Sequence, residues 1–374
     1  MYISLIIIIL AVFFACISQR KRVPATHSNS NSIVIQYNYF NSYLFLISFF
    51  LLFILCFLSK TGDDIPAYVY YYSNWTWKDL LDFEVETGYK LLCLLLRIIF
   101  RNPYVGIGVI KFISLALVFQ SIYMLRDRLN VGFAVFAYVC ILYVHAFHLL
   151  RIMIAVGLVY LAYAYIIKGK KKQGFILLLL SALFHYSSII VFIAYIIYRI
   201  VGKVLTIKKL IIVSLVLLFV YFNVEILVKL GVSNLGILSK YSIYITNIES
   251  GSGLAQLILF LPILYIILTL NPTDKNDNMY ILCSIIGIMS FFAGSLGYIF
   301  EVIGRSTYYF NYFTIIYCAT MPVRKDKVYV NVGFTEFNIR SVLSFVYILL
   351  YLAFTYVIPG KSVDIITEYE FFWA

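Results

Sequence analysis

Long runs of hydrophobic residues, separated by short polar segments, recur along the whole chain. Apolar runs of this kind with few charges are typical of helices that cross a lipid bilayer. The runs predict about twelve spans, at residues 2–18, 43–59, 104–125, 131–148, 152–167, 173–185, 187–199, 210–222, 254–270, 279–298, 306–321 and 340–358. We therefore expect an all-α, polytopic integral membrane protein in which residues 1–374 form a single transmembrane domain.

The composition supports lipid as the solvent for most of the chain. Hydrophobic residues make up 63% of it and charged residues only 12%, with a mean hydropathy of +0.95. The 19 glycines and 7 prolines exclude a collagenous chain. The six cysteines lie in or beside apolar runs, which excludes a small disulfide-rich secreted protein.

The positions of the basic residues orient the helices. In a soluble protein, a formal net charge of +12 would point to a nucleic-acid partner. In this apolar chain the location of the basic residues matters more than their sum, and we expect no nucleic-acid partner. Lysine and arginine concentrate on the cytoplasmic side of membrane proteins. The cytoplasmic clusters are then Arg20–Arg22, Arg126–Arg128, Lys168–Lys172, Arg199–Lys209 and Arg324–Lys327. The apolar-then-basic order of residues 2–22 predicts an uncleaved first helix with its N-terminus outside.

Two segments do not fit a full crossing. A full crossing by residues 88–100 would move either the first basic cluster or all the later ones to the outer side. These residues should therefore form a re-entrant or interfacial helix. Residues 173–199 carry basic clusters at both ends and should form a hairpin, whose arms of about 20 Å fall short of a hydrocarbon core of about 30 Å. The tip, with His185, should therefore face a cavity below the outer surface. The larger loops, 60–87 and 223–253, lie outside.

The first outer loop is acidic and aromatic. Asp63 and Asp64 are among its carboxylates, and Tyr68 and Tyr72 are among its rings. Amphipathic rings stack on the apolar faces of sugars, but they also form the aromatic belt at a membrane–water interface. Both interpretations of these rings stay open.

Four arginines fall on the outer side, against the orientation rule: Arg97, Arg101, Arg151 and Arg305. A guanidinium is permanently charged, and its planar fork of donors matches phosphate oxygens. The alternative is that these side chains reach out to the headgroups of the outer leaflet.

Histidine supplies the candidate acid or base. His185 combines a titratable ring with an expected recessed position, which suits a general base or acid. His145 and His148 lack a neighbouring third ligand, so they are weak zinc candidates, and we expect neither a metal nor another cofactor.

Several short motifs occur in order along the chain. They are Gly62-Asp63-Asp64 with Tyr68 and Tyr72, then Glu86-Thr87-Gly88-Tyr89, Leu150-Arg151 with Ala155, Lys168–Lys172, Ala182-Leu183-Phe184-His185-Tyr186-Ser187, and Arg305 with Tyr309. Their order and spacing resemble the EpsG/Wzy-type family of polysaccharide polymerases, across nearly the whole chain.

The resemblance implies a glycosyltransferase in the bacterial cytoplasmic membrane with its site facing outside. Such enzymes join oligosaccharide repeat units, carried on polyprenyl diphosphate, into capsule, O-antigen or exopolysaccharide. The implied partners are the lipid-linked oligosaccharide, the growing glycan and the lipid bilayer, together with chain-length regulator and flippase proteins.

The resemblance also implies roles for individual residues. Arg151 and Arg305 would hold the diphosphate, and His185 or Asp63 would take the acceptor proton, with Asp64 and Glu86 as other candidates for the base. Glu86 would otherwise orient a sugar or a basic neighbour. The remaining substrate contacts would come from Asp64, Tyr68, Tyr72, Arg97, Arg101 and Tyr309.

Two other functions fit the same features. A transporter or flippase of lipid-linked sugars would also use a basic cavity, although the unusual polar residues here collect on one side. A membrane glycosyltransferase that uses polyprenyl-monophosphate sugars would use the acidic first loop as a metal site.

Overall fold

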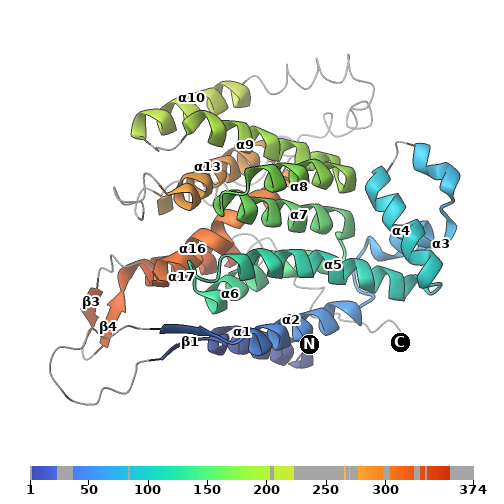
Figure 1. Cartoon of the computed structure of the whole chain (residues 1–374), viewed down its shortest axis with the longest axis horizontal. Coiled ribbons are helices and arrows are strands. Elements are labelled where there is room, and N and C mark those ends of the chain that lie inside the picture. Colours follow the sequence, from blue (N-terminus) through green and yellow to red (C-terminus); the bar gives the residue numbers. More distant parts are fainter. Residues whose placement is uncertain are drawn as a thin grey trace.

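The computed structural model describes most of the chain, and Figure 1 shows its course. The described residues are 2–22, 37–82, 85–202, 206–222, 265–266, 269, 277–297, 304–323, 329–332 and 335–353. The expected outer loop at 223–253 lies outside the described residues, as does most of the expected span at 254–270.

The described elements are mainly helices. The α-helices are α1 (Tyr2–Ser18), α2 (Ser42–Phe57), α3 (Ile65–Asn74), α4 (Thr87–Ile99), α5 (Pro103–Met124), α6 (Val131–Ile141), α7 (Leu150–Ile167), α8 (Lys171–Phe184), α9 (Ile190–Val201), α10 (Ile207–Phe222), α13 (Asn278–Gly297), α15 (Thr307–Phe310), α16 (Cys318–Thr320) and α17 (Ile339–Leu352). Shorter 3₁₀ or π turns are η1 (Trp77–Leu81), η2 (Tyr143–Phe147), η3 (Tyr186–Ile189), η6 (Phe313–Tyr317) and η7 (Met321–Val323). The expectation of a helical fold is confirmed.

Two short antiparallel hairpins are additions to the expected all-α fold. Strand β1 (Gln19–Arg22) pairs with β2 (Tyr37–Phe40), and β3 (Tyr329–Val332) pairs with β4 (Thr335–Asn338). Strand β1 follows α1 directly, and β4 directly precedes α17. Pairing in the hairpins gives hydrogen-bond partners to backbone groups just beyond these helix ends. Asn41 N, for example, donates to Ser18 O at 2.7 Å, next to the first ladder.

The long helices of the bundle run side by side. In Figure 1, α3 and α4 lie together at one end, and both strand hairpins lie at the other. Helix α7 packs between α5 and α8, and α1 packs along α2. We call the end with α3 and α4 the α3–α4 end.

Asparagine begins three of these helices. The Oδ1 atoms of Asn41, Asn102 and Asn130 accept backbone N–H groups in the first turns of α2, α5 and α6. These side chains satisfy donors that have no partner inside the helix. In α5, Pro103 at the first turn adds a fixed helical φ, which favours the same start.

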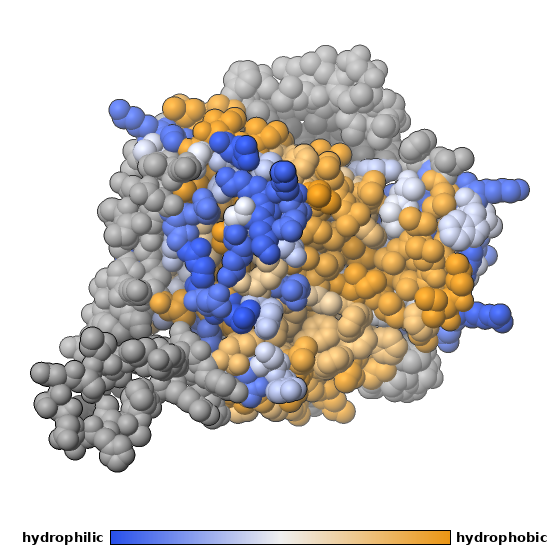
Figure 2. All heavy atoms as spheres, in the orientation of Figure 1, coloured by the Kyte–Doolittle hydropathy of each residue, from blue (hydrophilic) through white to orange (hydrophobic). Residues whose placement is uncertain are grey.

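Two described helices are long and apolar enough to cross a membrane, namely α5 and α7. Six shorter apolar helices accompany them: Ile3–Ser18, Ser42–Phe57, Val131–Ile141, Tyr186–Val201, Asn278–Gly294 and Ile339–Leu352. Figure 2 shows hydrophobic residues over the broad middle of one face and hydrophilic residues towards its two ends. This distribution is typical of a protein surrounded by lipid.

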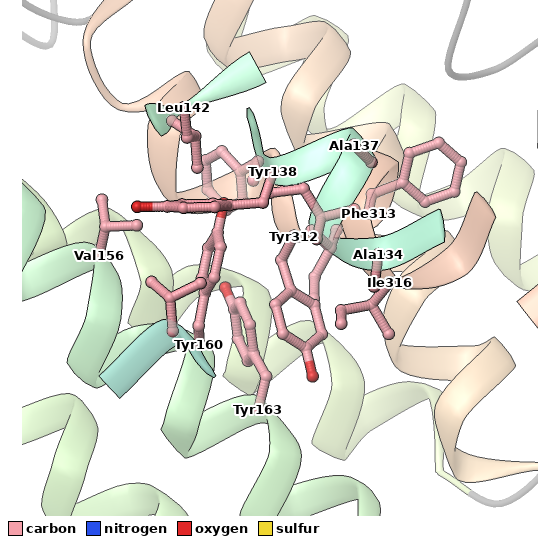
Figure 3. Packing of buried hydrophobic residues seen from close by; sticks show 14 of the residues in the cluster. Ala134, Ala137, Tyr138, Leu142, Val156, Tyr160, Tyr163, Tyr312, Phe313 and Ile316 are labelled. Atoms are coloured by element: carbon pink, nitrogen blue, oxygen red, sulfur yellow. The ribbon is translucent and has the colours of Figure 1, made fainter. Parts of the chain in front are cut away.

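Tyrosines fill the centre of the bundle. Tyr138 of α6 and Tyr160 and Tyr163 of α7 gather around Tyr312, as Figure 3 shows, and all four are buried. Tyr160 Oη donates to Tyr308 O at 2.9 Å. Helices α6 and α7 are therefore packed against the segment that leads from α15 to η6.

The helix expected over residues 131–148 is wrong in its second half. Helix α6 ends at Ile141, and the 3₁₀ turn η2 follows. Tyr143 Oη donates to Leu52 O at 2.6 Å, and Cys56 Sγ lies 3.4 Å from Ala146 O. These contacts with α2 hold the segment as a turn.

Candidate functional site

Glu86 lies where three parts of the chain meet. It is the N-cap residue of α4, and its carbonyl accepts the backbone N–H groups of Tyr89 and Lys90 at 3.1 and 3.2 Å. Its side chain is only 4% exposed. A carboxylate buried to this extent is costly unless cations or donors compensate for the water that it loses.

Two basic side chains from other helices meet this carboxylate. Arg151 Nη1 donates to Glu86 Oε2 at 2.7 Å. His185 Nδ1 lies 2.8 Å from Glu86 Oε1, at ion-pair distance but without the alignment of a good hydrogen bond. The backbone N–H of Tyr186 also donates to Oε1, at 3.3 Å.

The backbone explains how Arg151 and His185 reach the same carboxylate. Arg151 is the second residue of α7, at the start of that helix. His185 follows the last residue of α8 in an extended conformation (φ −157°, ψ 117°), and its N–H still bonds Ser181 O at 3.0 Å. The change from helix to extended backbone turns the ring away from α8 and towards α4.

Glycine at position 88 allows α4 to approach α8. A Cβ atom built on Gly88 would lie 2.6 Å from the backbone oxygen of Leu183. Gly88 is two residues from Glu86, and Leu183 is two residues from His185. This close backbone contact therefore sets the distance between the carboxylate and the imidazole.

Tyr68 of α3 completes the group. Its side chain is hydrogen-bonded to Arg151, and the residue is 6% exposed. Burial raises the pKa of Tyr68, more than the neighbouring Arg151 lowers it, so the hydroxyl stays protonated at neutral pH. We call Glu86, Arg151, His185 and Tyr68 the Glu86 cluster.

The charge of Glu86 is fixed by its partners. Burial by itself would raise the pKa of this carboxyl, but the contact with His185 and the positive charge of Arg151 outweigh burial and lower the pKa from 4.5 to about 2. Glu86 is therefore a carboxylate throughout the physiological range.

Arg305 and Tyr309 lie on a neighbouring segment. Tyr309 is buried in α15, and its hydroxyl is 3.0 Å from Ser187 Oγ, two residues beyond His185. Arg305 is exposed and precedes Tyr309 by one helical turn. The Tyr309–Ser187 hydrogen bond ties this segment to the turn that carries His185.

Asp63 and Asp64 lie beside His148, just before α3. Gly62, with φ +126°, is in the left-handed region, and a Cβ there would lie 2.4 Å from His148 Cβ. Asp63 is exposed and Asp64 is half-buried, and both interact electrostatically with His148. Asp64 also interacts with Tyr68, which links these carboxylates to the edge of the Glu86 cluster.

Tyr72, Arg97 and Arg101 occupy different surroundings. Tyr72 Oη donates to Phe100 O at 2.8 Å and its ring packs against Gly106, so this residue joins α3 to the start of α5. Arg97 donates to the carbonyls of Tyr72 and Ser73 at 3.1 and 2.8 Å, at the C-terminal end of α3. Arg101 is exposed in the turn between α4 and α5.

Two buried lysines outside the expected site residues act in the same way as Arg97. Lys90 Nζ donates to Asp79 O and Asp82 O at 2.8 and 2.6 Å. Lys111 Nζ donates to Cys56 O and Ser59 O at 3.1 and 2.8 Å, at the end of α2. The sequence pattern that could have indicated them is a lysine within an apolar run, because a charge in such a helix is costly unless it binds carbonyls or anions.

The expected site residues thus fall into two sets. The structure brings Glu86, Arg151, His185 and Tyr68 together and links Tyr309 to them through Ser187. The other expected residues lie outside this group, and they are Asp63, Asp64, Tyr72, Arg97, Arg101 and Arg305. Within the described part of the chain, no three His, Cys, Asp or Glu side chains are grouped closely enough to hold a metal ion.

Comparison with known proteins supports the family expected from the motifs. A family model described as the EpsG family matches residues 41–371 of the chain. No curated protein and no solved structure matches it.

Proposed function

We propose that this chain, which belongs to the EpsG family, polymerises oligosaccharide repeat units carried on polyprenyl diphosphate. Membership of this family points to an enzyme of polysaccharide synthesis and to a membrane protein. The lipid carrier, the bond that is formed and the side of the membrane are our own proposals. They include an arrangement of about twelve spans in the cytoplasmic membrane with the α3–α4 end outside.

One observation carries the chemistry: a buried carboxylate that contacts both an arginine and a histidine. Glu86 faces Nδ1 of His185 and so favours the tautomer in which Nδ1 carries the proton. Nε2 is then the acceptor atom, as in hydrolases where a carboxylate orients a histidine base. Glu86 therefore acts as a positioning residue, and His185 is the proposed base.

The step that we propose is a direct transfer of the growing glycan. A hydroxyl of the incoming unit attacks the anomeric carbon that links the growing glycan to its diphosphate. The bond from that carbon to the diphosphate oxygen breaks and the polyprenyl diphosphate leaves with the electron pair. A new glycosidic bond forms, and the hydroxyl proton moves to Nε2 of His185.

Cations stabilise the leaving group in this proposal. Arg151 gives one N–H to Glu86 and shares another bond with Tyr68, yet its side chain is 29% exposed. The remaining N–H groups of its planar fork are therefore available to a diphosphate oxygen. The exposed Arg305, on the segment tied to Ser187, is the second proposed cation.

The proposal is tested by reconstitution. The purified chain in lipid nanodiscs is given lipid-linked repeat units extracted from a strain in which its gene is deleted. We expect glycans of several repeat units and release of one polyprenyl diphosphate for each bond formed, with the same rate in the presence of EDTA.

Two outcomes would contradict the proposal. Movement of the substrate across a liposome membrane without new glycosidic bonds would identify a flippase. A polymerase rate that depends on added divalent cations would favour the metal-dependent glycosyltransferase.

A further inference from the structure

A continuous row of aromatic rings leads from Arg151 to the surface of α3. Tyr68, which is bonded to Arg151, meets Tyr89 edge-on with ring centroids 5.7 Å apart. Tyr89 meets Trp75 edge-on at 6.1 Å. Trp75 stacks on Tyr71 at 4.8 Å, with an interplanar angle of 7°.

The row is buried at the Glu86 cluster and exposed at its other end. Tyr89 is 1% exposed, whereas Tyr70, which meets Tyr71 edge-on, is 64% exposed. Trp77, at the start of η1, is 54% exposed, and Tyr71 and Trp75 are half-buried. Large rings are thus presented to the surroundings in a segment that is continuous with the proposed site.

Two cations hold the backbone that carries the exposed rings. Lys90 is 1% exposed, bonds the carbonyls of Asp79 and Asp82 in and after η1, and lies 5.8 Å above the Trp75 ring. Arg97 donates to Trp75 O at 2.5 Å and to Ser73 O at 2.8 Å. A segment fixed in this way loses little freedom when a ligand binds, because its order is already present.

We propose that Tyr70, Tyr71, Trp75 and Trp77 form a carbohydrate-binding platform that holds the glycan beside the Glu86 cluster. This inference rests on the proposed function and names the part of the substrate that each region binds. The rings stack on the apolar faces of sugar rings, in the manner of other amphipathic aromatic contacts.

The carboxylates beside the rings favour sugar over lipid headgroups, although the exposed Lys78 also lies next to Trp77. Asp79 is half-buried and Asp82 is exposed, and both lie within five residues of Trp77. The Thr76 N–H and hydroxyl lower the pKa of Asp79, so this carboxylate stays charged. Carboxylates accept hydrogen bonds from sugar hydroxyls, but they repel the phosphates of phospholipids.

The first test measures the length of the polymer. Trp77→Ala and Tyr70→Ala change exposed rings, so the fold should persist, and Tyr43→Ala changes a tyrosine that is 79% exposed at the first turn of α2. Each variant is given lipid-linked repeat units, and the length distribution of its products is compared with that of the wild type. The products of the two platform variants should be shorter by about fivefold, since each ring contributes to retention of the glycan. Tyr43→Ala should give wild-type lengths.

The second test measures binding without turnover. The chain has three tryptophans, two of which lie in the platform, so its intrinsic fluorescence should change saturably with free oligosaccharide released by mild acid from the lipid-linked units. We expect the apparent affinity to fall by about fivefold or more in Tyr70→Ala. A matched titration uses phosphatidylglycerol in mixed micelles.

The outcomes separate this inference from the proposed function. Wild-type product lengths in both platform variants, or a fluorescence response to phosphatidylglycerol and not to oligosaccharide, would overturn the platform and assign the rings to a membrane belt. If the wild-type chain forms no polymer, the proposed function fails, and the oligosaccharide titration still decides whether the platform binds sugar.

Discussion

At the scale of single residues, the charge of Glu86 organises the site. Its two oxygens face different basic groups, Arg151 at 2.7 Å and His185 at 2.8 Å, and the side chain is almost fully buried. Removing one member of such a buried group leaves the others without compensation. The substitution that keeps the shape of the side chain is therefore the most informative one.

Glu86→Gln should lower the turnover number for polymerisation by about 10- to 100-fold, the effect typical of a residue that orients a functional ligand. The amide cannot keep His185 in the tautomer with Nδ1 protonated, so the transition state loses its base while binding of the lipid-linked unit persists. The measurement is kcat and KM separately, with Glu86→Asp as the conservative variant. An unchanged kcat with a raised KM would make Glu86 a sugar contact instead.

The stability contributed by Glu86 should depend on pH in a defined direction. The pKa of this carboxyl is lowered in the folded protein, from 4.5 to about 2. A lowered pKa gives stability that is complete above the unfolded value and is lost as the pH falls towards the folded value. The difference in Tm between the wild type and Glu86→Gln should not decrease between pH 8 and about pH 5 and should shrink below about pH 4.5. A difference that already shrinks between pH 8 and 6 would contradict this account.

At the scale of elements, the contact between α4 and α8 holds the site together. Gly88 lies against the Leu183 backbone, where no side chain can move aside to make room for a Cβ atom. The same type of contact occurs far from the site, where a Cβ on Gly174 would lie 2.8 Å from Ala162 O and 2.6 Å from Ile166 Cγ1. These two glycines form a matched pair, one beside the Glu86 cluster and one at the other end of α8.

Gly88→Ala should reduce polymerisation by tenfold or more, because α4 must move away from α8 and Glu86 must move away from His185. The expected loss of stability is about 1–3 kcal/mol, as for other overpacked contacts. Gly174→Ala should cost a similar amount of stability and keep most of the activity. The comparison uses initial rates together with the thermal unfolding of each variant, and equal activity in the two variants would show that the α4–α8 distance does not matter.

The sequence predicted elements better than it predicted contacts. The apolar runs at 2–18, 104–125 and 279–298 match α1, α5 and α13 to within one residue at each end, since apolar composition directly determines such helices. The end of α6 could not be predicted, because it depends on the Tyr143 hydroxyl bonding to Leu52, which is distant in sequence.

The same limit applies to the site. His185 and Arg151 could be proposed from their chemistry, and Glu86 as the group that orients a basic neighbour. Arg97 illustrates the opposite case, because its partners are carbonyls 22 to 25 residues away, which no local pattern shows. An arginine that binds a phosphate and an arginine that caps a helix look the same in a sequence.

At the scale of the whole molecule, charge and apolar surface are separated along the bundle axis. The basic residues Lys168 and Lys170–Lys172 lie at the end of α7 opposite to Arg151. The α3–α4 end carries the Glu86 cluster and the aromatic platform (Figure 1). The orientation rule then predicts that the first group faces the cytoplasm and that the second faces outside.

Cysteine labelling in intact cells tests this orientation. In a background with the exposed Cys16 changed to serine, Asn74→Cys should react with an impermeant maleimide and Lys170→Cys should not, although both positions are exposed. Both should react after the membrane is opened. Labelling of position 170 in intact cells, with protection of position 74, would invert the orientation and place the Glu86 cluster on the cytoplasmic side.

The most direct test of the central claim is the initial rate of glycosidic bond formation by His185→Ala in nanodiscs. If His185 Nε2 takes the acceptor proton, the rate should fall by about 10²- to 10⁴-fold, with the variant still in the membrane and still binding the lipid-linked unit. His145→Ala and His148→Ala, made in parallel, should stay within about tenfold of the wild type. A His185→Ala variant with the wild-type rate and pH profile would contradict the claim and move the search for the base to Asp63 and Asp64.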